Sequence, residues 1–171
     1  AVWSIIFSLL VIFMYILLRF RKWQFSLGAV AAVFHDVIIV LSIFSFFYGI
    51  LPFSLEIDQA FIAAILTIIG YSLNDTVVVF DRVREYMNLN KKKKIHEFMN
   101  GSLNSTLSRT INTSLTTFFV LLVIFIFGGE VIRGFMFALM VGVIVGTYSS
   151  LFIASPIMLD TMGAKAESSK K

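Results

Sequence analysis

Residues 60–80 read Ala-Phe-Ile-Ala-Ala-Ile-Leu-Thr-Ile-Ile-Gly-Tyr-Ser-Leu-Asn-Asp-Thr-Val-Val-Val-Phe, an apolar run that contains one aspartate, Asp75. The run is long enough to cross a membrane as a helix, which takes about 20 apolar residues. A carboxylate at that depth costs at least about 2.5–3.5 kcal/mol on insertion scales. Such a residue usually faces the interior of a helix bundle and handles an ion, a proton or a charged partner. Asp75 is therefore the first candidate for a functional residue.

The composition of the whole chain is typical of an integral membrane protein. Of its 171 residues, 58% are hydrophobic and 14% are charged, whereas about 25% of residues are charged in soluble domains. The absence of cysteine excludes disulfides, thiol chemistry and cysteine-based metal sites. The net charge of +4 is better explained by membrane topology and anionic lipids than by binding to nucleic acid.

Five apolar segments predict an all-α polytopic membrane bundle. They cover residues 2–18, 25–50, 59–80, 110–127 and 134–158, within a transmembrane domain at 1–160 that is followed by a basic tail at 161–171. The segment 81–108 carries more charged residues than any other connection. Within it, apolar residues from Ile95 to Leu107 recur at i, i+3 and i+4, which predicts an amphipathic helix lying at the membrane interface.

Basic residues predict the orientation of the chain. Most of the fourteen Lys and Arg residues lie in the first connection, the third connection and the tail: Arg19, Arg21, Lys22, Arg82, Arg84, Lys91–Lys94, Lys165, Lys170 and Lys171. The positive-inside rule places these parts in the cytoplasm and residue 1 outside. The run Lys91–Lys94 most simply enforces this orientation, and a specific partner site is the alternative.

The start of the sequence predicts that this chain is a fragment of a longer protein. No signal peptide precedes the first apolar segment, which nevertheless begins outside the membrane. We expect an upstream, externally projecting portion to be missing. A short N-terminus that crosses unaided is the alternative.

Polar residues share one face of the third predicted helix. Thr67, Tyr71, Ser72, Asn74 and Asp75 follow helical spacing. A carboxylate on such a face can bind a proton from one side and release it to the other if access alternates. The alternative is a structural carboxylate that only bonds neighbouring helices.

The fourth predicted helix offers a counter-charge, Arg109, on a face shared with Thr113, Thr116 and Thr117. Arginine does not lose its proton at ordinary pH, so it suits a fixed charge rather than a relay. An Asp75–Arg109 pair would form when Asp75 is ionised and separate when it is protonated. Alternatively, Arg109 extends to the cytoplasmic headgroups.

A second carboxylate, Asp36, follows His35 near the middle of the second predicted helix. The two could belong to the same polar relay as Asp75, in which Ser72, Asn74, Thr113 and Thr116 are the further candidates. A helix–helix bond or a bound water explains His35 and Asp36 equally well. No His or carboxylate set has metal-ligand spacing, and no nucleophile–base pair of hydrolase type is visible. We therefore expect no enzyme and disfavour intramembrane proteolysis.

Small residues repeat every four positions along the last predicted helix: Gly134, Ala138, Gly142, Gly146 and Ser150. A stripe of this kind lets another helix approach closely. We expect it to serve helix packing.

Two longer motifs remain: residues 70–85 read Gly-Tyr-Ser-Leu-Asn-Asp-Thr-Val-Val-Val-Phe-Asp-Arg-Val-Arg-Glu, and residues 105–117 read Ser-Thr-Leu-Ser-Arg-Thr-Ile-Asn-Thr-Ser-Leu-Thr-Thr. With Ala-Val-Phe-His-Asp at 32–36 and Phe-Gly-Gly-Glu at 127–130, they closely resemble the SecF half of the SecD/SecF protein-export family. That family belongs to the resistance-nodulation-division superfamily and assists the Sec translocon in the bacterial cell membrane.

The resemblance implies a motor that pulls exported polypeptide outward at the expense of the proton gradient, or of sodium in some members. Asp75 would be the essential membrane carboxylate of the SecF half, and Arg109 the functional arginine of the next helix. The chain would comprise helices two to six of a six-helix half. The implied partners are a SecD half, the translocon channel and unfolded polypeptide held by external domains that this chain lacks, and no cofactor is implied.

Two alternative functions remain at this stage. The chain could belong to another transporter of the superfamily that exports lipids or small molecules, or it could be a non-transporting scaffold of the translocon. The sequence leaves open whether protons or sodium ions are coupled, and whether the SecD half is fused or separate.

Overall fold

The computed structural model describes the backbone of residues 2–89 and 95–168, and the side chains of residues 3, 7, 9–89 and 99–162. The described backbone forms helices joined by short connections: α1 (Val2–Phe20), α2 (Trp23–Phe47), α3 (Gln59–Leu89), α4 (Ile95–Phe127), α5 (Glu130–Ser149), the π-helical turn η1 (Ser150–Ala154) and α6 (Ser155–Ser168). Two predictions concern residues that the structure does not describe: the one for the lysine run and the one for most of the tail. These residues are Lys91–Lys94, Lys170, Lys171 and the side chain of Lys165.

The prediction of an all-α membrane bundle is confirmed. Within the described part of the chain, four helical stretches are long and apolar enough to cross a membrane: Trp23–Phe47, Gln59–Leu89, Met99–Phe127 and Glu130–Met162. The last stretch runs through α5, η1 and α6, and the apolar stretch Leu9–Phe20 of α1 is shorter. The chain is a multi-pass membrane protein.

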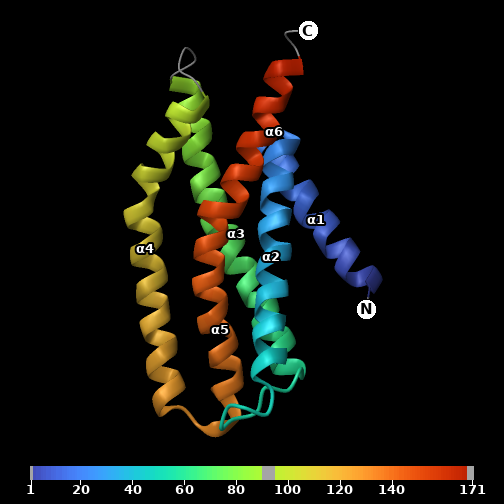
Figure 1. Ribbon diagram of the computed structural model, residues 1–171, viewed down its shortest axis with the longest axis vertical. Helices are drawn as coiled ribbons and strands as arrows, with labels where there is room; N and C mark the ends of the chain where they lie inside the picture. The colour runs from blue at the N-terminus through green and yellow to red at the C-terminus, as the bar shows by residue number, and fades with distance from the viewer. Residues whose placement is uncertain (1, 90–94, 169–171) are drawn as a thin grey trace.

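The long helices stand side by side, with α5 contacting α2, α3 and α4, while α1 contacts mainly α2 and leans away from the bundle toward its N-terminus (Figure 1). One end of the bundle carries the α1–α2 connection, the end of α3, the start of α4 and the end of α6, and it is called the basic end. The other end carries the α2–α3 and α4–α5 connections and is called the opposite end.

The predicted interfacial helix between the third and fourth spans is wrong as a separate element. Ile95 begins α4, which continues without a break to Phe127. Hydroxyl residues do not interrupt it, because Ser102 and Thr106 donate to main-chain carbonyls one turn earlier in the same helix. Its amphipathic face packs on another helix instead of lipid headgroups: Met99 is buried, and Gly101 lies against the ring of Tyr86 in α3. The third helix continues beyond the predicted span 59–80, to Leu89.

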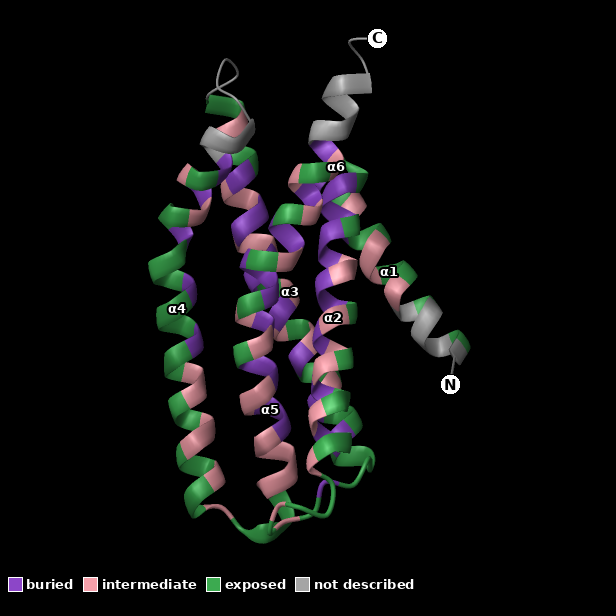
Figure 2. Cartoon of the chain, viewed as in Figure 1, coloured by how far each residue is buried: buried purple, intermediate pink, exposed green. Residues whose placement is uncertain are grey.

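The core consists of two apolar clusters with a polar layer between them. Near the basic end, Phe80 of α3 packs edge-on against Phe25, at 5.0 Å between ring centroids. Near the opposite end, Phe44 of α2 packs on Phe61 of α3, at 4.5 Å. Figure 2 shows the buried residues along α2 and on the facing sides of α3 and α5, whereas α4 is mostly exposed. Only 11% of the apolar window of α4 is buried, against 44% for the span that contains α5, so α4 is the least buried of the four spans.

Candidate functional site

The polar layer is centred on Asp36 of α2, whose side chain is fully buried. Its Oδ2 accepts a hydrogen bond of 2.6 Å from Ser72 Oγ of α3 and one of 2.8 Å from Ser149 Oγ of α5. His35 Nδ1 lies 3.2 Å from the other carboxylate oxygen. A buried carboxylate is costly unless its oxygens are bonded. Here three groups bond it, so Asp36 ties three helices together.

The stripe of small residues in α5 permits this approach. A Cβ atom at Gly146 would lie 3.1 Å from the Cβ of Ser72, and a Cβ at Gly142 would clash with the side chain of Ile68. A Cβ at Gly134 would lie 2.5 Å from the main-chain oxygen of Ser54. Ala138 between them is fully buried. The backbones of α3 and α5 are therefore close enough for short hydroxyl side chains to reach Asp36.

A π-helical turn, η1, follows Ser149 directly and changes the direction in which the next residues point. Pro156 has no N–H to continue the α-helical ladder. Ser155 Oγ donates instead to the main-chain oxygen of Ser150, at 3.0 Å. Turns of this kind often lie at functional sites. Ser150 belongs to the four-residue repeat seen in the sequence, whereas Ser149 was not predicted, although Pro156 inside an apolar run was an available signal.

Asp75 is buried as well, at 6% exposure, but its bonding is different. It follows Ser72 by three residues, so the two lie on the same side of α3. Its Oδ2 is buried and has no hydrogen-bond partner among the described residues. Arg109 of α4 is close enough for its charge to act on Asp75. No ion pair within 4.0 Å joins these two described side chains in this structure.

Polar contacts between α3 and α4 flank Asp75 on both sides. Tyr71 donates to Ser114 at 3.3 Å on one side, and Arg82 Nε donates to Ser105 Oγ at 2.9 Å on the other. The antiparallel register between these contacts sets Thr110 at the level of Asp75. Thr110 is buried, and its hydroxyl has no partner among the described residues. Two buried oxygen atoms without partners, on Asp75 and Thr110, therefore lie at one level of the bundle.

Three of the predicted relay residues do not reach this layer. Thr113 and Thr116 are exposed and donate to main-chain carbonyls of their own helix, including those of Arg109 and Asn112. Asn74 lies on the exposed side of α3. The structure thus gathers Asp36, His35 and Ser72, and leaves these three apart.

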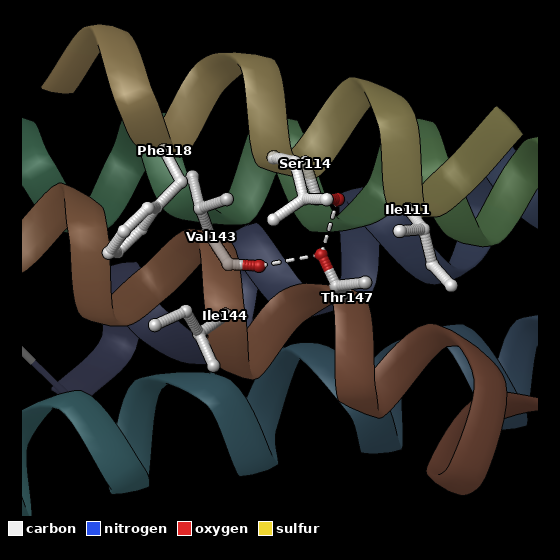
Figure 3. A pocket seen from close by; sticks show the side chains of 7 residues that line it. Ile111, Ser114, Phe118, Val143, Ile144 and Thr147 are labelled. Atoms are coloured by element: carbon white, nitrogen blue, oxygen red, sulfur yellow. Dashed lines mark hydrogen bonds between the residues drawn. The ribbon is translucent and has the colours of Figure 1, made fainter. Parts of the chain in front are cut away.

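A hollow of about 260 Å³ lies between α4 and α5 (Figure 3). Its polar lining is a chain of hydroxyls: Ser114 and Thr147 are 2.6 Å apart, and Thr147 donates to the main-chain oxygen of Val143 at 2.7 Å. The other lining residues are apolar: Ile111, Leu115, Phe118, Val143 and Ile144. No ionisable group lines the hollow, so it suits packing rather than ion binding.

Among the described residues, no group of three His, Cys, Asp or Glu could hold a metal ion.

The sequence of this chain matches a known protein family. Residues 1–164 match the model of the family described as protein export membrane protein SecD/SecF, C-terminal. The protein translocase subunit SecF of Rhodothermus marinus is 65% identical over 160 residues, which cover 94% of this chain and 52% of the relative. The subunit SecF of Rhodobacter capsulatus is 48% identical, over 93% of this chain and 46% of the relative.

Solved structures agree. A crystal structure of SecDF in a super-membrane-facing form has a TM-score of 0.84 at 40% identity, over 99% of this chain and 22% of that one. SecDF from Thermus thermophilus, described as a translocon-associated membrane protein, gives 0.82 at 41% identity, over 95% and 22%. The chain spans about half the length of the curated relatives it matches. It belongs to the SecD/SecF family of protein export membrane proteins.

Proposed function

We propose that this chain is the membrane portion of a SecF-type subunit, in which Asp75 carries the coupling ion and Arg109 is its counter-charge. The observation that carries the proposal is the bonding of Asp75: it is a buried carboxylate with an oxygen that no described residue bonds, and the charge of Arg109 acts on it. A carboxylate left in that state is available to a proton or a cation. The relatives named as protein translocase subunits support protein export as the process that is driven.

The two charged residues lie on helices that are held differently. Asp75 is on α3, which packs on α2, α4 and α5, whereas Arg109 is on the mostly exposed α4. Ionised Asp75 attracts Arg109, and neutral Asp75 does not. Binding and release of a proton would therefore move α4 relative to α3 between two positions. Such a two-state element is what coupling to a gradient requires.

Asp36 has the complementary role in this proposal. Its two short hydroxyl bonds and the neighbouring imidazole hold α2, α3 and α5 in register. We assign it to a fixed frame against which Asp75 and α4 work. Thr110, opposite Asp75, is positioned to bond the carboxyl group in one of its two states.

The distribution of Lys and Arg supports an orientation with the basic end in the cytoplasm and the opposite end outside the bacterial cell membrane. Protons would then enter from the opposite end and leave toward the basic end. A carboxylate with hydroxyl neighbours also serves sodium, so the ion is a proton or sodium. The partners would be a SecD half, the translocon channel and exported polypeptide, contacted through domains outside this chain.

The test is translocation by the complete assembly, reconstituted in vesicles, with Asp75→Asn. We expect preprotein translocation to lose its dependence on the ion gradient. The matched control is Asp160→Asn, which removes the same charge from an exposed position on α6 and should retain gradient-dependent export. Gradient-driven export at the normal rate in Asp75→Asn would refute ion coupling through this residue. Normal preprotein processing with a stranded lipid or drug would favour another transporter function.

A further inference from the structure

Three arginines from distant parts of the chain meet at the basic end. Arg19 is in the last turn of α1, Arg21 lies between α1 and α2, and Arg84 lies on α3. Together with Leu18 and Phe20 they line a hollow of about 440 Å³. Their positions in the sequence do not require this convergence, because about 60 residues separate Arg84 from the others.

The structure holds these arginines in place. Arg19 Nη2 donates to Asp81 Oδ2 at 2.8 Å, and Arg84 Nη1 donates to the main-chain oxygen of Arg19 at 3.4 Å. Arg21 adopts a φ of 57°, a left-handed conformation that residues other than glycine rarely take. Its N–H closes α1 by donating to the main-chain oxygen of Leu17, at 2.8 Å. The chain thus turns sharply at the residue that contributes the middle arginine.

The hollow keeps an excess of positive charge. Among the described residues, one carboxylate forms an ion pair with an arginine of the hollow: Asp81 pairs with Arg19. Arg21 and Arg84 form no ion pair with any described carboxylate. All three guanidinium groups are on exposed residues. Guanidinium groups match the oxygen atoms of a phosphate as two-pronged donors, so an organic phosphate is the ligand class that fits.

The surroundings favour a lipid as the source of that phosphate. Leu18, in the lining of the hollow, is 74% exposed, and Trp23, two residues after Arg21 at the start of α2, is 45% exposed. Tyr15 and Val11 continue an exposed apolar face along α1. Trp and Tyr are enriched at the level of lipid headgroups. An acyl chain could follow this face while its headgroup lies among the arginines.

We propose that the hollow formed by Arg19, Arg21 and Arg84 is a binding site for the phosphate of an anionic phospholipid. The lipid would join α1 to α3 at the basic end, where few protein contacts link these helices. This site is independent of the ion-coupling role of Asp75.

The test measures retained lipid. The complete protein is placed in nanodiscs of phosphatidylglycerol and phosphatidylcholine, extracted with detergent and analysed by native mass spectrometry. Arg21→Gln should reduce retained phosphatidylglycerol about fivefold, the typical effect of one basic residue near an anionic surface. Arg133→Gln removes the same charge at the opposite end and should change nothing. Equal retention in the two variants would overturn the proposal.

A second variant and a competitor separate the remaining explanations. Arg84→Lys keeps the charge but removes the two-pronged geometry, so we expect partial loss of phosphatidylglycerol with unchanged helical circular dichroism. Full retention in this variant would mean that general attraction, not a shaped site, holds the lipid. Displacement of the lipid by millimolar inorganic phosphate would identify a free phosphate site and would overturn the lipid assignment.

Discussion

Asp36 and Asp75 are both carboxylates buried in the same polar layer, yet their surroundings differ. Asp36 is bonded by two hydroxyls and lies beside an imidazole nitrogen, whereas the buried oxygen of Asp75 has no partner among the described residues. Burial alone therefore does not distinguish a structural carboxylate from a working one. The satisfied carboxylate stabilises the assembly of helices, and the unsatisfied one is free to exchange an ion. Each prediction below tests one side of this contrast.

The largest effect on stability is expected for Gly142→Leu. Its side chain would collide with Ile68 and separate α5 from α3, which would also pull Ser149 away from Asp36. Overpacking of a close contact costs about 1–3 kcal/mol or more. Unfolding in mixed micelles should show this loss. Gly70→Leu is the control, because a Cβ at Gly70 meets no atom within 4 Å. Equal stability of the two variants would contradict the close α3–α5 packing.

Asp36→Asn should destabilise the bundle next most strongly. It replaces charge-assisted hydrogen bonds by neutral ones, at a cost of about 1–2 kcal/mol. Asp75→Asn is the matched comparison and should leave stability unchanged within about 0.5 kcal/mol, because the buried oxygen of Asp75 has no hydrogen bond to lose among the described residues. Both are measured by the same unfolding assay. A larger loss for Asp75→Asn would reverse the assignment of the two roles.

Ser149→Ala should have a smaller effect, because it removes one of the two hydroxyl bonds to Asp36. Hydrogen bonds between membrane helices contribute about 0.6 kcal/mol on average and up to about 1.7. Ser42→Ala is the control, since Ser42 donates only to a carbonyl of its own helix on an exposed face. If both variants unfolded alike, the bond from Ser149 would carry no measurable stability.

The smallest effect is expected for Thr110→Val. The Thr110 hydroxyl has no partner among the described residues, so its removal should change stability by less than about 0.5 kcal/mol. The informative readout is gradient-driven export, which should fall if Thr110 bonds Asp75 during the cycle. Normal export together with normal stability would exclude Thr110 from the mechanism.

Much of the fold was predictable, because spanning segments are read from length and hydropathy. The course of residues 95–107 was not, because an amphipathic face looks the same whether it meets headgroups or another helix. In this protein it meets α3, through Met99 and Gly101.

The site was predictable only in part, for a related reason. Asp75 and Asp36 stand out in the sequence because they are charged residues in apolar runs. Their partners do not, because a hydroxyl such as that of Thr113 can bond its own helix, while Ser149 bonds a residue 113 positions away. The π-helical turn after Ser149 also breaks the four-residue periodicity that drew attention to Ser150.

The most direct test is infrared difference spectroscopy of the complete assembly across a change in pH, in the parent protein and in Asp75→Asn and Asp36→Asn. Protonation of a buried carboxylate produces a carbonyl band that identifies the titrating residue by its loss. We expect the band to disappear in Asp75→Asn and to persist in Asp36→Asn. A band that persists in Asp75→Asn and disappears in Asp36→Asn would contradict the assignment of ion exchange to Asp75.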